Sequence, residues 1–265
     1  MNTPKTIKDQ IKNDYLNNFL SNAELSKKYK LHRVSIRRIL KSEKVKLRKR
    51  TPGTKVNHFF FSSYSRESCY WAGFLLADGY IRTNKRFTIE LKLQKRDYTH
   101  LQKMKKSLNF EGRIIEKETY CNVSISSSQL VCDLLNKFEI GTKKSLTCYI
   151  SDKIPKKYLC DFIRGYFDGD GSISFTSTDA ISILGTKRTI SFIREYFFNY
   201  CKIKLRSKDK PVISKLTNIY AISYSGISAF KCAHKLYEKA VLYLDRKQLL
   251  YLDMKEKYKN KISKL

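Results

Sequence analysis

Hydrophobic and polar positions follow two different periods along this chain. In residues 86–95, "RFTIELKLQK", apolar side chains alternate with polar ones. The apolar positions are Phe87, Ile89, Leu91 and Leu93, and the polar positions are Thr88, Glu90, Lys92 and Gln94. A period of two is typical of a half-buried β-strand. In residues 97–108 and 128–140 the apolar positions recur every three to four residues, which predicts amphipathic helices.

The same order of elements occurs twice. A strongly apolar helix is followed by a hairpin, a helix, a second hairpin and a helix, first in residues 67–150 and again in residues 151–265. These two segments are therefore predicted as tandem αββαββα repeats of the α+β class, with two antiparallel sheets. Because the helices of a repeat can cover only one face of its sheet, we expect one polar sheet face per repeat to stay free.

Residues 1–46 stand apart as an all-helical segment. Apolar residues at helical spacing predict a first helix with Ile7, Ile11, Tyr15 and Phe19. A short helix through Tyr29 and a third helix over residues 33–43 would follow, joined by a tight turn, which is the helix-turn-helix pattern. The third helix is expected to turn Val34, Ile36, Ile39 and Leu40 inward. Its other face carries the candidate DNA-contacting residues Arg33, Ser35, Arg37 and Arg38.

A plain three-helix packing unit with a solvated basic face is the alternative for this segment. Residues 47–66 are basic at the start, contain Pro52-Gly53 and lack apolar periodicity, so they are predicted as a linker.

The apolar helix that opens each repeat ends on Asp-Gly. The two stretches are "YWAGFLLADGY" (residues 70–80) and "FIRGYFDGDGS" (residues 162–172). In each, two small residues are spaced four apart, which places them on one helix face and favours close packing of the two helices. Gly79 and Gly171 are expected to end the helices in the left-handed conformation.

Each of these helix ends also carries an aspartate, Asp78 in the first and Asp170 in the second. If the helices pack together, Asp78 and Asp170 lie side by side, and two carboxylates so close repel each other unless a cation lies between them. Mg²⁺, or another divalent cation such as Mn²⁺, is the cation that such an arrangement predicts, and it would support hydrolysis of a phosphodiester.

The net charge and the cysteine content indicate which class of partner the protein binds and in which kind of compartment it is expected. The chain has 54 Lys+Arg against 24 Asp+Glu, a net charge of +30, which indicates nucleic acid as the partner. The seven cysteines contain no C-x-x-C pair, so neither a zinc site nor a disulfide framework is indicated and an intracellular, reducing compartment is expected. No apolar run approaches the roughly 18 residues of a membrane span.

The two motifs, "WAGFLLADG" and "IRGYFDGDG", resemble those of the LAGLIDADG homing endonucleases in their single-chain, two-motif form. The resemblance implies two saddle-shaped sheets in the DNA major groove and a monomer on a long asymmetric duplex site. It implies that Asp78 and Asp170 bind Mg²⁺ and that a staggered double-strand cut results. It also places Gln94, Lys95 and Lys187 where the family holds the attacking water or offsets charge, with Lys92 and Gln94 on the DNA-facing strand.

Some positions depart from the family pattern. The sixth motif position is Leu76 in the first copy and Asp168 in the second, and we expect Asp168 to be a solvated or capping acid. Ser127 and Gly226 stand at later strand ends where the family pattern has lysine. Arg246 and Lys247, in "LDRK", are expected to steer DNA.

Three functions stay open from the sequence: a site-specific endonuclease, a noncleaving DNA-binding regulator and an intron RNA-splicing maturase. A regulator on this fold would be expected to lose one or both motif acids, and both are present here. The endonuclease is therefore favoured.

Overall fold

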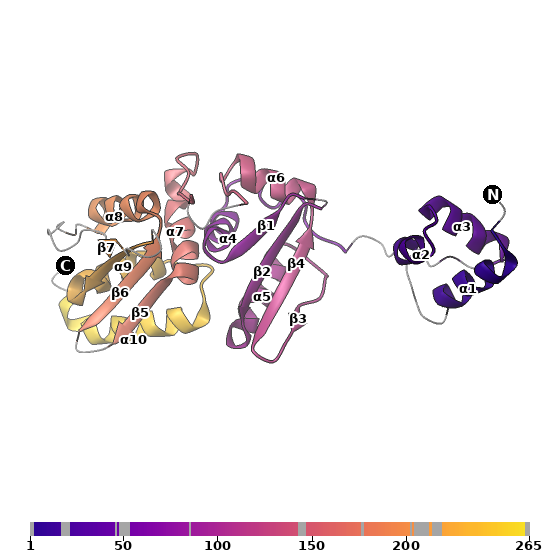
Figure 1. Ribbon diagram of the computed structural model, residues 1–265. Coiled ribbons are helices and arrows are strands. Elements are labelled where there is room, and N and C mark those ends of the chain that lie inside the picture. The colour runs from indigo at the N-terminus through magenta and orange to yellow at the C-terminus, as the bar shows by residue number, and fades with distance from the viewer. Residues whose placement is uncertain are drawn as a thin grey trace. The chain divides into compact units, whose positions relative to one another are not determined.

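The computed structural model describes residues 3–16, 22–45, 47, 54–84, 86–142, 147–175, 178–201, 203, 212–213 and 219–262. The chain divides into two compact units, Met1–Gly53 and Thr54–Leu265 (Figure 1).

The first unit contains three helices, α1 (Lys5–Leu16), α2 (Asn22–Lys28) and α3 (Arg33–Ser42). Its small core is made of Ile11, Tyr15, Leu25, Ile36, Ile39, Leu40 and Val45. Asp14 is buried beside it and accepts hydrogen bonds from Lys28 Nζ, at 2.6 Å, and from the Tyr29 hydroxyl, at 2.7 Å. Phe19, expected on the first helix, lies outside the described residues.

One inward position of α3 was predicted wrongly. Val34 is 50% exposed, whereas Ile36, Ile39 and Leu40 are buried. Positions 36, 39 and 40 share a helix face, and a residue two positions earlier points away from it. Val34 therefore lies on the same exposed side as the arginines of α3.

The second unit contains two antiparallel sheets, as predicted. The first sheet has the order β1-β2-β4-β3 and the second the order β5-β6-β8-β7. The strands of the first sheet are β1 (Gly79–Arg82), β2 (Thr88–Gln94), β3 (Ile115–Glu116) and β4 (Tyr120–Ser126). Those of the second are β5 (Gly171–Phe175), β6 (Asp179–Gly185), β7 (Val212–Ile213) and β8 (Tyr220–Ser225).

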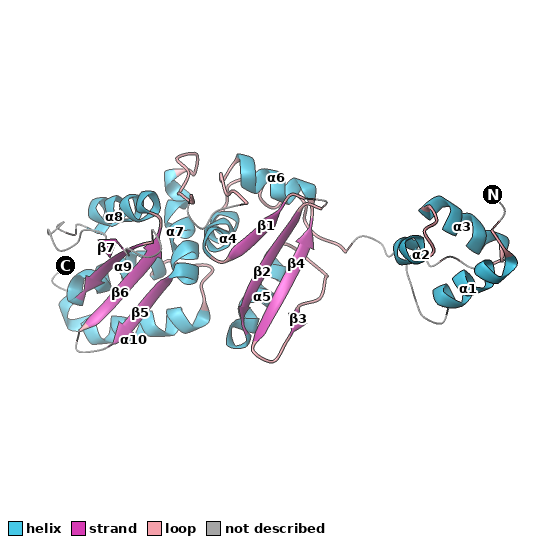
Figure 2. Cartoon of the chain, viewed as in Figure 1, coloured by secondary structure: helices cyan, strands magenta, loops and turns pink. Residues whose placement is uncertain are grey.

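Helices occupy the predicted places between the strands (Figure 2). The first repeat has α4 (Arg66–Ala77), the short 3₁₀ helix η1 (Lys95–Asp97), α5 (Tyr98–Ser107) and α6 (Ser128–Asn136). The second has α7 (Lys156–Asp170), α8 (Lys187–Cys201) and α9 (Gly226–Tyr237). A further helix, α10 (Asp245–Ile262), comes after α9 in the chain and contacts α9 and β5. The sequence analysis did not predict this helix.

One continuous hydrophobic core joins both repeats and includes residues that were predicted as linker. Phe61 is fully buried in it, Val56 is buried at its edge, and Ser65 caps α4 by accepting a hydrogen bond from the Ser68 amide. Two backbone bonds, Asn57 N–Leu108 O and Glu111 N–Lys55 O, fasten the approach to α4. Residues 54–66 are therefore part of the second unit, and only residues before them can act as a linker.

Within the described ranges, no helix is both long enough and apolar enough to cross a membrane. All seven cysteines lie in described segments, and none of them forms a disulfide bond there.

Candidate functional site

Helices α4 and α7 pack with their backbones in direct contact. A Cβ atom added at Gly73 would lie 2.0 Å from the carbonyl oxygen of Phe162, and one at Gly165 would lie 2.0 Å from the carbonyl oxygen of Tyr70. No side chain larger than glycine fits at either place without moving a helix. The close approach predicted from the spacing of small residues is therefore confirmed.

The two motif acids lie at the same end of this helix pair. Asp78 is the C-terminal cap of α4, and Asp170 is the last residue of α7. A Cβ atom at Gly169 would lie 2.3 Å from Ala77 Cβ and 3.3 Å from Asp78 Oδ2, so the Asp78 carboxyl group rests against the last turn of α7. Asp78 is exposed and Asp170 is half-buried.

The glycines that follow the acids serve a different purpose from the predicted one. Gly171 has φ −99° and ψ 168°, and Gly226 is the glycine with positive φ among the described residues. Gly79 and Gly171 instead begin β1 and β5. A Cβ atom at Gly79 would lie 2.7 Å from Leu75 O, and one at Gly171 would lie 2.6 Å from Phe167 O. Glycine is required there because each strand leaves its helix across the last turn.

Lys247 is buried beneath the end of α7, which contradicts its predicted role in steering DNA. Its side chain is 1% exposed. Its Nζ donates hydrogen bonds to the carbonyl oxygens of Phe167, Asp168 and Gly171, at 2.6, 2.8 and 2.6 Å. Phe167 and Asp168 lie in the last turn of α7, and Gly171 is its C-terminal cap, whose own amide also donates to Phe167 O. Lys247 therefore fixes the backbone on both sides of Asp170.

The charge of Lys247 is set by its burial and by the acids around it. Burial lowers its pKa to about 8, while the carboxylates of Asp168, Asp78 and Asp170 favour its charged form. The ammonium group of Lys247 therefore interacts electrostatically with both motif acids and partly offsets the repulsion between them. Its neighbour Arg246 pairs with Asp97 at 3.2 Å.

Asp168 was predicted to be a solvated or capping acid, and the structure shows that it is buried. It is 1% exposed and accepts hydrogen bonds from the hydroxyls of Tyr70 (2.7 Å) and Tyr237 and from the amide of Leu244 (2.9 Å). Burial raises the pKa of Asp168, although Lys247 and the two tyrosines favour its charged form. Because Tyr70 belongs to α4 and Tyr237 to α9, this carboxyl group ties the two repeats together.

The predicted residues Lys92, Gln94 and Lys95 lie at or just after the C-terminal end of β2, which is the end of the strand next to Asp78. Gly79 is opposite Leu91 in the register, so Lys92 is at the height of Asp78, and Gln94 is two residues farther along β2. Lys92 and Gln94 are exposed, with Lys92 Nζ 3.7 Å from the centre of the Tyr120 ring. Lys95, in η1, is exposed as well.

In the second repeat, the residues near Asp170 differ from those near Asp78 in the first. Gly171 is opposite Ile183, so Leu184 takes the place that Lys92 has in the first repeat, and Thr186 the place of Gln94. The Thr186 hydroxyl is committed to Cys148 O, at 2.6 Å. Lys187 is exposed at the start of α8. The basic residues are thus not distributed equally between the two acids.

Tyr166 is a residue of this site that the sequence analysis did not single out. It precedes Asp170 by four residues and so shares its helix face. Its hydroxyl donates to Leu184 O at 2.9 Å, and burial together with the Asp170 carboxylate raises its pKa. A cavity of about 230 Å³ adjoins it, lined by Leu76, Ala77, Cys148, Tyr166, Asp170, Leu184, Gly185 and Ile219.

Ser127 and Gly226, at the strand ends where the resemblance led us to expect lysine, have structural roles. Ser127 Oγ accepts from the Leu130 amide at the start of α6 and lies 2.8 Å from His58 Nδ1. Gly226 has φ +57° at the start of α9, a conformation that side chains rarely adopt.

In the first unit, Arg33, Arg37 and Arg38 are exposed on α3, and Ser35 is half-buried. They share one helix, as predicted, and Val34 stands among them.

The donor set at the helix ends suits a hard cation. Among the described residues there is no cluster of three or more His, Cys, Asp or Glu side chains that could hold a metal ion. The ends of α4 and α7 supply two carboxylates, Asp78 and Asp170, whose possible ligand atoms are all oxygen. Mg²⁺ is commonly held by one or two carboxylates together with water and phosphate oxygens, so two acids fit it and do not fit a structural zinc ion.

Comparison with known proteins agrees with the sequence resemblance. Residues 67–158 match the family model described as "WhiA LAGLIDADG-like domain". The match spans the first motif, the first repeat and the start of the second, so the resemblance to LAGLIDADG proteins is confirmed there. No curated protein matches the chain.

Several solved structures are similar to this chain. The LAGLIDADG homing endonuclease I-GzeII in complex with its DNA target has 13% sequence identity over 77% of this chain and 93% of its own, with a TM-score of 0.49. The LAGLIDADG meganuclease I-AabMI bound to uncleaved DNA has 11% identity over 75% and 92%, also with a TM-score of 0.49. At this similarity, the fold is assigned from the chain's own topology and from the match of residues 67–158.

Proposed function

We propose that this protein, in which residues 67–158 form a LAGLIDADG-like domain, is a site-specific double-strand DNA endonuclease of the homing type. The observation that carries the proposal is the placement of Asp78 and Asp170 at the adjoining C-terminal ends of two helices packed backbone to backbone. The close contact at Gly73 and Gly165 brings the C-terminal ends of α4 and α7, and with them the two acids, together. Packing of the two helices alone would not require an acid at either end.

Asp78 and Asp170 would hold Mg²⁺ or Mn²⁺, which when bound polarises a scissile phosphate and lowers the pKa of a bound water. Asp78, being exposed, is open to a phosphate group. Asp170 is half-buried and is oriented by the backbone that Lys247 holds on either side of it. Lys95 and Lys187 are proposed to offset charge near the cut, and Gln94 to orient the attacking water.

DNA would lie on the free faces of the two sheets. The outward face of the first sheet carries Lys92, Gln94 and the ion pair of Arg82 with Glu90, whereas the described strands of the second present serine, alanine and leucine there. Two such different faces in one chain suit a monomer on a long asymmetric site better than a palindrome. The excess of 30 positive charges supplies the attraction to phosphates that this binding requires.

The first unit is proposed to act as a helix-turn-helix module that binds DNA beside the cut. Arg33, Arg37 and Arg38 would contact phosphates or guanine edges, Ser35 would contact a base or a phosphate, and the exposed Val34 would contact a thymine methyl group. Deletion of residues 1–53 should leave cleavage of the central site intact and reduce the slope of log K against log salt by about 0.9 for each phosphate that this unit neutralises. An unchanged slope and an unchanged footprint would show that this unit does not bind DNA.

The cleavage proposal is tested on a site selected from a randomised duplex library with the purified protein. Asp78→Asn and Asp170→Asn should each abolish double-strand cleavage in Mg²⁺ and leave duplex affinity equal or higher, because each removes a negative charge near the phosphates. Asp253→Asn, an exposed acid on α10, is the charge-matched control and should cut normally. Normal cleavage by either motif variant would refute the shared-metal assignment.

A noncleaving DNA-binding regulator is the second candidate. The observation that favours it is the family match itself, whose description names a LAGLIDADG-like domain and no nuclease. Under this alternative the wild-type protein protects a duplex site from digestion and leaves both strands intact in Mg²⁺ and in Mn²⁺. The selection experiment above decides between the two candidates.

A further inference from the structure

A second cavity, lined by basic residues, lies at the opposite ends of the two motif helices. It has a volume of about 380 Å³ and lies between the N-terminal ends of α4 and α7 and the C-terminal end of α9. Lys157 lines it near the start of α7, and Asp170 ends the same helix 13 residues later, roughly 20 Å away at 1.5 Å per residue. The cavity is therefore separate from the motif acids.

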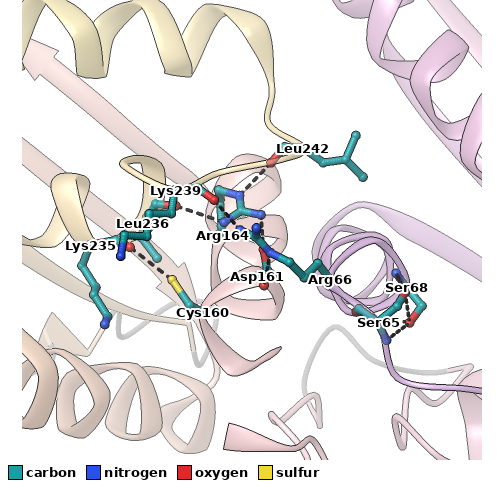
Figure 3. A network of polar contacts seen from close by, with 10 residues as sticks. All are labelled: Ser65, Arg66, Ser68, Cys160, Asp161, Arg164, Lys235, Leu236, Lys239 and Leu242. Atoms are coloured by element: carbon teal, nitrogen blue, oxygen red, sulfur yellow. Dashed lines mark hydrogen bonds and ion pairs between the residues drawn. The ribbon is translucent and has the colours of Figure 1, made fainter. Parts of the chain in front are cut away.

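The floor of the cavity is a fixed network of charges, shown in Figure 3. The buried guanidinium group of Arg164 bonds Asp161 at 2.6 Å and the carbonyl oxygens of Leu236 and Leu242 at 3.1 and 2.7 Å. Arg66, the first residue of α4, pairs with the same carboxylate at 3.3 Å and also reaches Lys239 O. One carboxylate is thus shared by two guanidinium groups, which leaves the floor with an excess of one positive charge.

The rim adds further positive charge. Lys157, Lys235 and Lys239 line the cavity with exposed side chains, and in the described part of the chain none of them has an ion-pair partner. Glu238, a carboxylate on the rim, is held by Lys255 at 2.9 Å and by the Tyr251 hydroxyl. Five cations and two carboxylates among the lining residues leave an excess of three positive charges.

Helix α7 contributes an additional attraction for anions. It begins after Pro155 with no side-chain cap, and its first turn contains no acid. The positive end of its dipole is therefore not offset by its own first turn, unlike that of α4, which has a capping box at Ser65 and Glu67 in its first turn.

Cysteine chemistry does not explain this cavity. The Cys160 thiol donates to Lys235 O at 3.1 Å, and burial raises its pKa, so it is held in the protonated, unreactive form.

From these contacts we infer that the cavity formed by Arg66, Lys157, Arg164, Lys235 and Lys239 binds a phosphate group carrying two or more negative charges. The three lysines would make the direct contacts as point charges, and the guanidinium groups below them would supply a fixed positive field. The group could belong to a free pyrophosphate or nucleotide, or to the phosphorylated end of a nucleic acid strand. This inference does not depend on the proposed cleavage.

The inference is tested on the full-length protein by calorimetric titration with sodium pyrophosphate, at constant ionic strength and without divalent cations. Saturable binding is expected, and the double variant Lys235→Gln/Lys239→Gln should weaken it at least tenfold, because two direct contacts are removed. The control Lys105→Gln/Lys106→Gln removes the same charge from the last turn of α5 and should bind as the wild type does. The absence of saturable binding, or an equal loss in the control, would overturn the inference.

Two further titrations identify the source of the phosphate. Oligonucleotides that differ only in a 5′-phosphate or a 5′-hydroxyl group show whether a strand end enters the cavity, since only the phosphorylated one should then lose affinity in the double variant. ATP against adenosine shows whether a nucleotide is accepted. Lys157→Gln, on α7, is an independent second variant and should weaken whichever ligand binds. Unchanged affinity in both variants would refute the assignment.

Discussion

His100 should make the stability of the second unit depend on pH. It lies on α5, fully buried, with its ring centre 4.8 Å from that of Trp71 and 4.7 Å from that of Phe74. Its Nε2 is 3.1 Å from the Tyr70 hydroxyl, which donates its own proton to Asp168. Nε2 must therefore carry the proton of the neutral ring, and Nδ1, which has no hydrogen-bond partner, stays unprotonated.

Protonation of Nδ1 would place a charge where nothing accepts it. Burial, and then the cations Lys103, Arg246 and Lys247, lower the pKa of His100 to about 3 from its usual 6.5. Because the unfolded chain binds this proton between pH 6.5 and 3 and the folded chain does not, the free energy of unfolding falls as the pH falls through that window. The loss from this one group is about 2 kcal/mol at pH 5 and approaches about 5 kcal/mol below pH 3.

The assay is urea unfolding followed by the fluorescence of Trp71. Because Trp71 is the chain's single tryptophan and its ring lies beside that of His100, its signal reports the second unit. In His100→Phe, the aromatic contacts are kept and the titration is removed. Between pH 8 and pH 5 the wild type should lose about 2 kcal/mol more stability than the variant. Equal losses in the two proteins would refute the assignment of a buried neutral histidine.

Two further predictions concern the helix pair and its cap. Gly165→Ala should destabilise the second unit by about 3 kcal/mol or more in the same urea assay, since its Cβ would meet a backbone oxygen at 2.0 Å, whereas Gly141→Ala, where a Cβ meets nothing, should change it by less than about 0.5 kcal/mol. Lys247→Met should cost about 3 kcal/mol because three carbonyls and Asp168 lose their cation, while Lys255→Met, on the surface of the same helix, should cost about 1 kcal/mol or less. Equal effects within either pair would contradict these packing and burial assignments.

The local periodicity of the sequence was sufficient to predict most elements of the second unit. Alternation in residues 86–95 predicted β2, because a strand with one buried face needs that pattern whatever it packs against. Small residues four apart, Gly73 with Ala77 and Gly165 with Gly169, predicted the close helix contact, because a face of small side chains lets two helix backbones approach closely. The boundary of the linker was missed, since Phe61 and Val56 show no period in a stretch without regular structure.

The roles of individual charges could not be predicted in the same way. Aspartate and lysine side chains are usually solvated. Asp168 and Lys247 are nevertheless buried, because each forms hydrogen bonds with residues far away in the sequence. Lys247 finds the end of α7 about 80 residues earlier, and Asp168 finds Tyr70 about 100 residues earlier. Such pairings depend on how α10, α7 and α4 are packed together, and no pattern within one element indicates them.

The repeat is symmetric in its fold and asymmetric in its chemistry. The same backbone carries Lys92 and Gln94 beside one acid, and Leu184 and a committed Thr186 beside the other. The outward face of the second sheet bears Ser172, Ser182 and Ser223 in one row across three strands, with Ser172 Oγ and Ser182 Oγ 2.7 Å apart. Hydroxyl groups can donate to or accept from several base edges, whereas Lys92 offers charge and Gln94 an amide with one donor and one acceptor side. If both faces bind one duplex, the first repeat supplies more of the salt-dependent affinity and the second more of the short-range contacts, and a single chain can then distinguish the two halves of its site.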